Sequence, residues 1–324
     1  MTATPMTIDV PLLVVIAGPT AVGKTSIGIQ LASHFSSEII SADSRQFFRE
    51  MKIGTAAPGD AELEAVPHHF VRHLSVHDAY NVSRYESDVL ALLEKLFVSY
   101  PVVFMVGGSG LYIDAVCHGI DLLPDPDAGT RKELKELLAT SGIGALREEL
   151  MRADPVYAAV VDASNPARLI RALEVCRTTG VPYSSFRTNQ PKKRPFRILK
   201  LGFGLQREVL NARINARVDA MMENGLYGEA LALYPLKHLN SLNTVGYREL
   251  FDHFEGLTSL EFAVEKIKTN TRRYAKRQLT WFGKDPQVHW SGPGEIRACI
   301  DLINTASAEG DIRSIPPQGR TRPW

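Results

Sequence analysis

Residues 12–25 read LLVVIAGPTAVGKT, and this stretch decides the fold. Its first six residues form a continuous apolar run, which is typical of a strand buried on both faces of a parallel sheet. Its last eight fit the phosphate-loop pattern G-x-x-x-x-G-K-[ST] at every fixed position. The following residues place Ile27, Leu31 and Phe35 at helical spacing. A strand that runs through a glycine loop into a helix predicts a phosphate-binding loop (P-loop), with an ordinary glycine-rich turn as the alternative.

Further apolar runs at residues 38–41, 102–106 and 198–203 predict more strands. Their alternation with helical patterns predicts an α/β fold, a P-loop NTPase-like parallel sheet. Between Pro124 and Lys193 strand-like runs disappear, and residues 131–138 and 168–176 show helical patterns, which indicates a helical insertion. We therefore expect three parts: an α/β core of residues 1–123 and 194–310 whose C-terminal helices include 209–231 and 260–282, an insertion of residues 124–193, and a tail that frays after Asp301, above all over residues 311–324.

The composition is typical of a folded globular protein and indicates no particular partner. The chain has 324 residues, 44% of them hydrophobic, and a formal net charge of +1, so any affinity for nucleic acid must come from local clusters of charge. Three isolated cysteines form neither a disulfide framework nor a zinc site. Neither a secretory leader nor an apolar run long enough to cross a membrane is present. We expect a soluble, cytoplasmic monomer.

The predicted P-loop would surround a phosphate with backbone N–H groups and the N-terminus of a helix. Lys24 would neutralise charge on that phosphate, and the Thr25 hydroxyl would be a ligand of Mg²⁺. The predicted phosphate-binding residues are Gly18, Pro19, Thr20, Ala21, Val22, Gly23, Lys24 and Thr25. The pattern alone leaves the ligand open between ATP, GTP and another diphosphate ester.

Asp43 follows the second predicted strand, at the sheet edge where open α/β sheets bind ligands. Three roles remain open for it: a Mg²⁺ ligand, a general base, or a cap of the next turn. Gln46 is a candidate for a hydrogen bond to a base edge. Residues 107–110, Gly-Gly-Ser-Gly, end another strand and either approach a ligand or form a plain turn. His68 and His69 have no further Cys or His at ligand spacing, which favours a hydrogen-bonded pair over zinc.

Residues 266–284 form a local basic segment without an acidic residue. It contains Lys266, Lys268, Arg272, Arg273, Lys276, Arg277 and Lys284, with Tyr274, Trp281 and Phe282 between them. Such a helix suits contact with RNA phosphates and stacking on bases, and a solvated helix face is the alternative. Two arginine pairs, Arg168 with Arg171 and Arg213 with Arg217, would hold phosphates or pair with carboxylates.

The combination of these blocks resembles the tRNA dimethylallyltransferase (tRNA isopentenyltransferase) family, which prenylates the N6 amine of an adenosine next to the anticodon. Beyond the P-loop, the matching blocks are residues 39–46, 53–56, 67–69, 106–112, 168–174, 245–249 and 271–282. The resemblance implies that the P-loop holds the diphosphate of dimethylallyl diphosphate with Mg²⁺. It implies that Asp43 is the general base and that Thr20, Lys24, Thr25 and Arg217 act on the diphosphate side. Catalysis would thus rest on Asp43, Thr20 and Arg217.

The same resemblance implies a set of tRNA contacts. Ser109 stands near the target nucleotide, where the family usually has Thr, and Ala167 stands where Gln is common. The residues implied to contact tRNA are Asp43, Ser44, Arg45, Gln46, Ser109, Arg131, Ala167, Arg168, Leu169, Ile170, Arg171, Asn243, Thr244, Val245, Gly246, Tyr247, Arg248, Lys276, Arg277, Gln278, Leu279, Thr280, Trp281, Phe282 and Gly283. The C-terminal zinc finger of eukaryotic members is absent, and the segment past Trp290 matches no block.

Three other functions stay open on the residues alone. A P-loop kinase or nucleotidase would use Asp43 as a Mg²⁺ ligand and consume ATP. A nucleotide-gated RNA-binding protein would need the basic segment but no base. A prenyltransferase that acts on free AMP or ADP would need no basic segment.

Overall fold

The computed structural model describes residues 10–125, 127–188 and 190–308, in two compact units. The core unit comprises Met1–Cys117 and Lys193–Trp324, and the helical unit comprises His118–Lys192. The sequence predicted this helical unit as an insertion of residues 124–193. None of the helices among the described residues combines the length and the apolar character that a membrane span requires.

The core unit is built on a six-stranded sheet in which every described strand pair is parallel. The order is β3-β2-β4-β1-β5-β6, so the α/β fold class predicted from the sequence is confirmed. The strands are β1 (Leu12–Ala17), β2 (Ile39–Ala42), β3 (His68–His69), β4 (Val102–Gly107), β5 (Arg197–Phe203) and β6 (Val288–Ser291). In register, Ala17 of β1 pairs with Gly107 of β4 and with Gly202 of β5. The carboxyl ends of the central strands therefore meet at one edge of the sheet, where ligands of such sheets bind.

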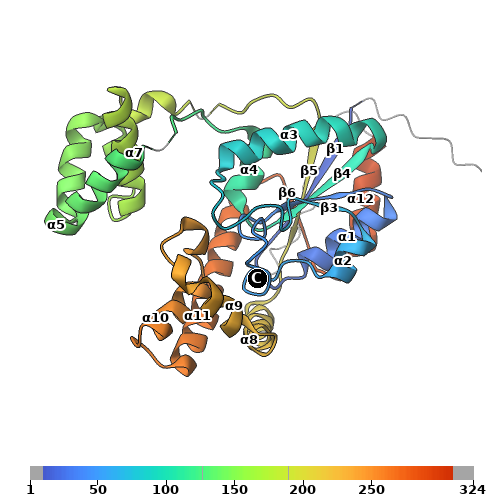
Figure 1. Ribbon diagram of the computed structural model, residues 1–324. Coiled ribbons are helices and arrows are strands. Elements are labelled where there is room, and N and C mark those ends of the chain that lie inside the picture. Colours follow the sequence, from blue (N-terminus) through green and yellow to red (C-terminus); the bar gives the residue numbers. More distant parts are fainter. Residues whose placement is uncertain (1–9, 126, 189, 309–324) are drawn as a thin grey trace, which may run out of the picture. The chain divides into compact units, whose positions relative to one another are not determined.

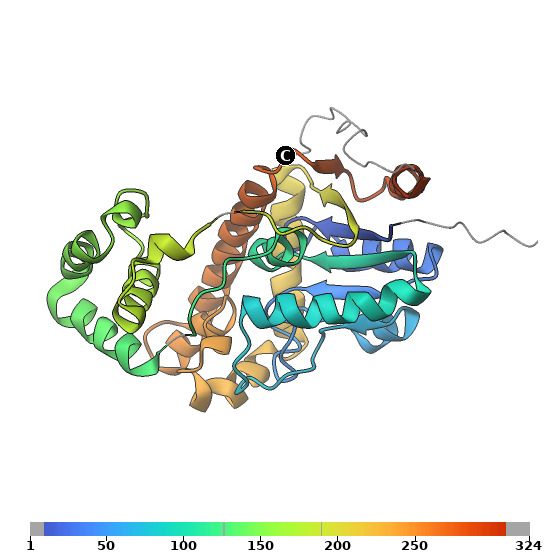
Figure 2. The same ribbon diagram turned by 90° about the horizontal axis from the view of Figure 1, so that it is seen from above.

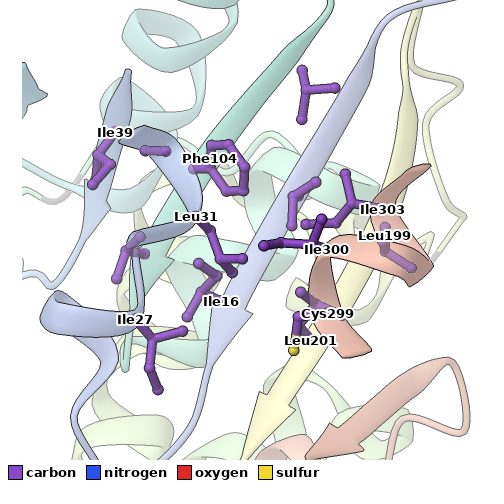
Figure 3. Close-up of a cluster of buried hydrophobic side chains, with 14 of the residues drawn as sticks. Ile16, Ile27, Leu31, Ile39, Phe104, Leu199, Leu201, Cys299, Ile300 and Ile303 are labelled. Atoms are coloured by element: carbon purple, nitrogen blue, oxygen red, sulfur yellow. The ribbon is translucent and has the colours of Figure 1, made fainter. Parts of the chain in front are cut away.

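Side chains of β1 alternate between two hydrophobic cores, one on each face of the sheet. Leu12, Val14 and Ile16 face α1 (Lys24–His34) and α12 (Ile296–Ala308), and Figure 3 shows Ile16 among Ile27, Leu31, Ile300 and Ile303 in this cluster. Leu13, Val15 and Ala17 face α3 (Val82–Ser99) and α4 (Gly110–His118), which cover the opposite face in Figure 1. Both faces of β1 are buried because helices cover both, which explains its unbroken apolar sequence.

Further helices lie beyond the carboxyl edge of the sheet. They are α8 (Arg207–Glu223), α9 (Leu226–Leu233), α10 (Tyr247–Phe254) and α11 (Leu260–Phe282), with short 3₁₀ turns at Tyr234–Leu236 and Asn240–Leu242. The short helix α2 (Asp60–Ala65) lies beside α1 instead (Figure 1). Figure 2 shows α11 beside α8, and a separate hydrophobic cluster that includes Leu226, Tyr247 and Ile267 joins α8 to α11. This arrangement places the basic segment of α11 next to the sheet edge.

The helical unit has a hydrophobic core of its own. It contains α5 (Ala128–Ala153), α6 (Pro155–Ala158), α7 (Pro166–Thr179) and a 3₁₀ turn at Tyr183–Phe186. Leu134, Leu146 and Leu150 of α5 pack against Leu169 and Leu173 of α7. Gly142 at φ 74° bends α5 between its two segments.

The C-terminal prediction needs a correction. The chain does not fray at Asp301, because α12 continues to Ala308 and inserts Ile300 and Ile303 into the core. Residues 309–324, including the predicted tail 311–324, lie outside the described residues.

Candidate active site

The P-loop connects β1 to α1 and leaves the start of α1 open to an anion. Gly18 has φ 152°, and a Cβ at this position would lie 2.5 Å from the carbonyl oxygen of Phe203, so only glycine fits between β1 and β5. Gly23, at φ 108°, precedes α1 and provides no side-chain cap. Among the described residues, no side chain caps the first N–H groups of α1, and together with the helix dipole these groups favour a bound phosphate.

A cavity of about 350 Å³ lies over this loop. Its lining brings together Thr20, Lys24 and Thr25 of the P-loop with Asp43 from the end of β2 and Arg217 from α8. The Lys24 ammonium donates a hydrogen bond to the carbonyl oxygen of Pro19 at 2.8 Å. Burial, together with nearby Arg217, lowers the pKa of Lys24 to about 8, although Asp43 partly opposes this shift. The sequence prediction of a phosphate-binding cluster thus corresponds to one cavity in the structure.

A second cavity, of about 120 Å³, adjoins the first and shares part of its lining. Thr20, Asp43 and Arg217 belong to both cavities, as do Thr55 and Ala56. The second cavity differs in its apolar walls, which are formed by Val218, Met221, Leu226, Val245 and Ile267. A polar compartment over the P-loop and a small apolar compartment therefore meet at Thr20, Asp43 and Arg217.

Local hydrogen bonds hold the groups at this junction. Arg217 donates to the Thr20 hydroxyl at 3.3 Å. Burial lowers the pKa of Arg217, while Asp43 acts in the opposite direction. One oxygen of Asp43 accepts the Arg45 backbone N–H at 3.1 Å, and its carbonyl accepts the Gln46 N–H at 3.1 Å. The turn after β2 therefore fixes Asp43 and leaves acceptor capacity on its carboxylate.

The glycine loop after β4 is joined to the turn after β2. The Ser109 N–H donates to the carbonyl of Ala42 at 3.1 Å, and the Ser44 N–H donates to the Ser109 hydroxyl at 3.0 Å. A Cβ on Gly107 would lie 2.2 Å from the carbonyl oxygen of Ala42, so the two strands approach closely at their ends. This contact places Ser109 beside the turn that carries Asp43.

Sequence reasoning missed several residues of this site. Tyr274 lines the second cavity and interacts with Ser109, and burial followed by the nearby Asp43 raises its pKa. Ile267, Thr271 and Tyr274 line that cavity from α11, and Gln278, one turn further on, lines the first. Their spacing of four, three and four residues marks one helix face and is the signal that would have found them. Gln46, predicted to meet a base edge, lines the first cavity and donates to the carbonyls of Thr55 and Ala56 at 3.3 and 3.1 Å.

The two histidines are hydrogen-bonded, as predicted. His68 Nδ1 lies 2.7 Å from the carbonyl of Val66, and His69 Nε2 lies 2.5 Å from a Glu38 carboxylate oxygen. In the described parts of the chain, three His, Cys, Asp or Glu side chains never gather closely enough to hold a metal ion. His68 also lines the larger cavity.

The basic segment is less isolated than its sequence indicates. Lys266 pairs with Asp252 at 3.3 Å, and Lys268 pairs with Asp219 at 2.8 Å and with Glu265 at 2.9 Å. Acidic residues from α8 and α10, and one just before the segment, therefore balance its first two cations. Arg273, Lys276 and Arg277 are exposed.

Several residues that were implied to contact tRNA have side chains in the interior. Leu169 and Ile170 belong to the core of the helical unit, Tyr247 and Phe282 belong to clusters of the core unit, and Gln278 is only 5% exposed. The side chains of these five residues therefore offer little surface for contact with tRNA. The exposed members of the set are Ala167, Arg168, Asn243, Arg248, Lys276, Arg277, Thr280 and Trp281.

Three of the six arginines of the same set form side-chain hydrogen bonds or ion pairs within the described part of the protein. Arg45 donates to the carbonyls of Asn240 and Ser241 at 3.0 and 2.9 Å. In the helical unit, Arg131 and Arg171 both pair with the buried carboxylate of Glu174, at 2.7 and 3.0 Å. Arg45 therefore stabilises a loop of the core unit, and Arg131 and Arg171 stabilise the helical unit.

Known proteins match both the sequence and the fold. A family model described as IPP transferase matches residues 46–285. A tRNA dimethylallyltransferase of Christiangramia forsetii is 53% identical over 278 residues, which are 86% of this chain and 92% of the relative. A tRNA isopentenylpyrophosphate transferase of Bacillus halodurans is 36% identical and has a TM-score of 0.68, with 91% of this chain and 96% of that chain covered. A eukaryotic dimethylallyltransferase acting on tRNA is 25% identical and has a TM-score of 0.75, with 96% of this chain and 82% of that chain covered. Because the family model covers well over half of the chain and the relatives match along most of their own length, this chain belongs to the IPP transferase family of tRNA dimethylallyltransferases.

Proposed function

We propose that this protein transfers a dimethylallyl group from dimethylallyl diphosphate to the N6 amine of an adenosine next to the anticodon of tRNA. The products are N6-isopentenyladenosine in tRNA and diphosphate. The observation that carries this proposal is the meeting of a phosphate-binding cavity and a small apolar cavity at Thr20, Asp43 and Arg217. Family membership supports the same reaction.

The donor's diphosphate fits the cavity over the P-loop. The uncapped start of α1, Lys24 and Arg217 all present positive charge or N–H groups to that cavity. As the bond to the allylic carbon breaks, negative charge accumulates on the leaving diphosphate. Groups already held around that position stabilise the charge without reorganising, which is the largest catalytic contribution available to such a site.

Mg²⁺ is the cofactor that we propose. Thr25 lines the cavity over the P-loop, and its hydroxyl together with the oxygens of a bound diphosphate would offer the oxygen donors that Mg²⁺ prefers. Because the described residues hold no cluster of three acidic or imidazole groups, Thr25 and the diphosphate itself would provide most of the non-water ligands. When bound, Mg²⁺ would neutralise part of the diphosphate charge.

The second cavity fits the hydrocarbon part of the donor. Its walls of Val218, Met221, Leu226, Val245 and Ile267 offer an apolar environment of small volume beside the phosphate site. The same walls keep water from the allylic carbon, which would otherwise be captured by hydrolysis as it gains cation character.

Asp43 is the proposed general base. The lone pair of an adenine N6 amine is delocalised, so the amine attacks only a strongly electrophilic carbon and must lose a proton as the C–N bond forms. Asp43 lies at the junction of the two cavities, and Ser109 is hydrogen-bonded to the turn that carries it. The adenosine would leave the base stack of the anticodon loop to reach this position.

The monomer is the catalytic unit in this proposal. Because tRNA is the acceptor, we place the activity in the cytoplasm.

The test combines the purified protein with dimethylallyl diphosphate, Mg²⁺ and unmodified tRNA, and measures released diphosphate together with the nucleosides of the tRNA by mass spectrometry. The expected result is N6-isopentenyladenosine in an amount equal to the released diphosphate. Parallel reactions replace tRNA with AMP or ADP, and replace the prenyl donor with ATP. Prenylated free nucleotide, or turnover of ATP without prenyl transfer, would refute the proposal in favour of the respective rival. Binding of tRNA without any turnover would indicate an RNA-binding protein without this chemistry.

A further inference from the structure

The side chain of Gln278, in α11, forms hydrogen bonds to two loops of the core unit. Its Oε1 accepts the backbone N–H of Thr20 in the P-loop at 2.8 Å. Its Nε2 donates to the carbonyl of Gly108, in the loop after β4, at 2.9 Å. The side chain is only 5% exposed, so these two hydrogen bonds form in a largely desolvated environment where they are difficult to replace.

Gln278 and Lys24 form hydrogen bonds to opposite sides of one peptide group, the one that joins Pro19 to Thr20. The N–H of Thr20 and the carbonyl of Pro19 belong to the same peptide group, and none of the described peptide bonds is cis. In a trans peptide these two groups point in opposite directions. Gln278 therefore binds the N–H side while the Lys24 ammonium donates to the carbonyl side at 2.8 Å. A change in the tilt of this peptide would displace the resting position of Lys24 and the Thr20 side chain together.

The Gln278 amide fits against Gly108 because glycine has no side chain. A Cβ on Gly108 would lie 2.1 Å from Nε2 of Gln278, and the next nearest atoms are at 3.3 and 3.6 Å. Gly108 has an ordinary φ, so an alanine there would be strained by the Gln278 side chain alone. The neighbouring Gly107 differs, because its Cβ would meet the backbone of Ala42 at 2.2 Å.

We propose that Gln278 is a positioning residue for the donor: it fixes the Pro19–Thr20 peptide, and through it Lys24 and Thr20, in the orientation that a diphosphate requires. This inference rests on the proposed function in that the ligand of the P-loop is a diphosphate. It assigns Gln278 to the donor site, although the family resemblance implies a tRNA contact for this residue. A primary amide provides an acceptor for Thr20 and a donor for Gly108 from one planar group, which explains the residue type.

The test measures binding of inorganic pyrophosphate with Mg²⁺, and separately of tRNA, to the full chain. Gln278→Ala should raise the Kd of pyrophosphate about tenfold, the loss expected for one or two buried hydrogen bonds that hold the loop. The Kd of tRNA should change less than about twofold, and in turnover the KM for the donor should rise more than the KM for tRNA. A direct tRNA contact would produce the opposite pattern and would overturn the proposal.

A double-mutant cycle tests the contact between Gln278 and Gly108. Gly108→Ala should impair pyrophosphate binding in the native background, because its methyl group displaces the Gln278 amide. In the Gln278→Ala background the same substitution should add less than about a twofold change, since the obstructing side chain is gone. Gly107→Ala, which collides with main chain, is the control that Gln278→Ala should not rescue. Additive effects of Gly108→Ala and Gln278→Ala would refute the inference.

Failure of this inference and failure of the proposed function give different results. A native protein that binds no pyrophosphate would remove the donor site itself. A native protein that binds pyrophosphate, with a Gln278→Ala variant that is folded and binds it equally well, would overturn only the role of Gln278.

Discussion

The affinity for the donor should fall as pH rises above about 8, because Lys24 loses its proton there. Burial and the nearby Arg217 lower the pKa of this lysine from 10.5 to about 8, against the attraction of Asp43. At pH 9 only about one tenth of the ligand-free protein would carry a charged Lys24, whereas an unperturbed lysine would still be more than about nine tenths charged. Since the charged form binds the diphosphate, the affinity is fully present below pH 8 and is lost above it. We expect the Kd of pyrophosphate to rise about tenfold per pH unit above pH 8, which corresponds to about 1.4 kcal/mol per unit.

The assay is isothermal titration of pyrophosphate at saturating Mg²⁺ between pH 6.5 and 10. Lys24→Arg is the matched control, because a guanidinium stays charged over this range and reports only the ionisation of the ligand. Lys24→Met should bind weakly, with no break near pH 8. A native Kd that follows that of Lys24→Arg up to pH 10 would refute the argument, because Lys24 would then keep an ordinary pKa.

Two further predictions concern α11 and the helical unit. Replacing Arg273 and Arg277 together by glutamine should reduce the slope of log K against log salt for tRNA binding by up to about two units, since each phosphate contact contributes about 0.9. The same change at Lys266 and Lys268, which already pair with carboxylates, should reduce it much less, and equal effects would refute a role for the two arginines. Glu174→Gln should destabilise the helical unit by about 2 kcal/mol, because the buried carboxylate pairs with two arginines that partly reach solvent. Hydrogen exchange of α5 and α7 in the full chain measures this loss, and unchanged exchange would contradict it.

Four of the six described strands were predicted from the sequence: β1, β4 and β5 from long apolar runs, and β2 from a short one. β1, β4 and β5 are buried on both faces, so their sequences show few polar interruptions. β3 and β6 escaped prediction because they are two and four residues long and contain His, Trp and Ser. Their existence depends on pairing with β2 and β5, which no local pattern encodes.

The residues of the site also fall into two groups: those that a local sequence pattern predicts and those that only the fold brings together. The P-loop could be predicted because eight consecutive residues carry it, and the position of Asp43 followed from the end of a strand. The meeting of Thr20 with Arg217, nearly two hundred residues away, came only from family resemblance. The apolar walls from Met221 and Leu226 could not be recognised, because the same residue types also fill cores. Family resemblance implied a tRNA contact for Gln278, and no local pattern showed that two loops provide it with buried partners.

The central claim is that Asp43 removes the amine proton at the junction of the two cavities. Asp43→Asn retains the size and the oxygen that accepts the Arg45 N–H, but it cannot take up a proton. Glu62→Gln is the control, since Glu62 lines the larger cavity but not the smaller one. The decisive measurement is the single-turnover rate of prenyl transfer to tRNA by Asp43→Asn across a Mg²⁺ titration. We predict a rate lower by about 10²-fold or more at every Mg²⁺ concentration, with a near-native rate for Glu62→Gln. Recovery of Asp43→Asn to a near-native rate at high Mg²⁺ would show instead that Asp43 is a metal ligand, and would contradict the account.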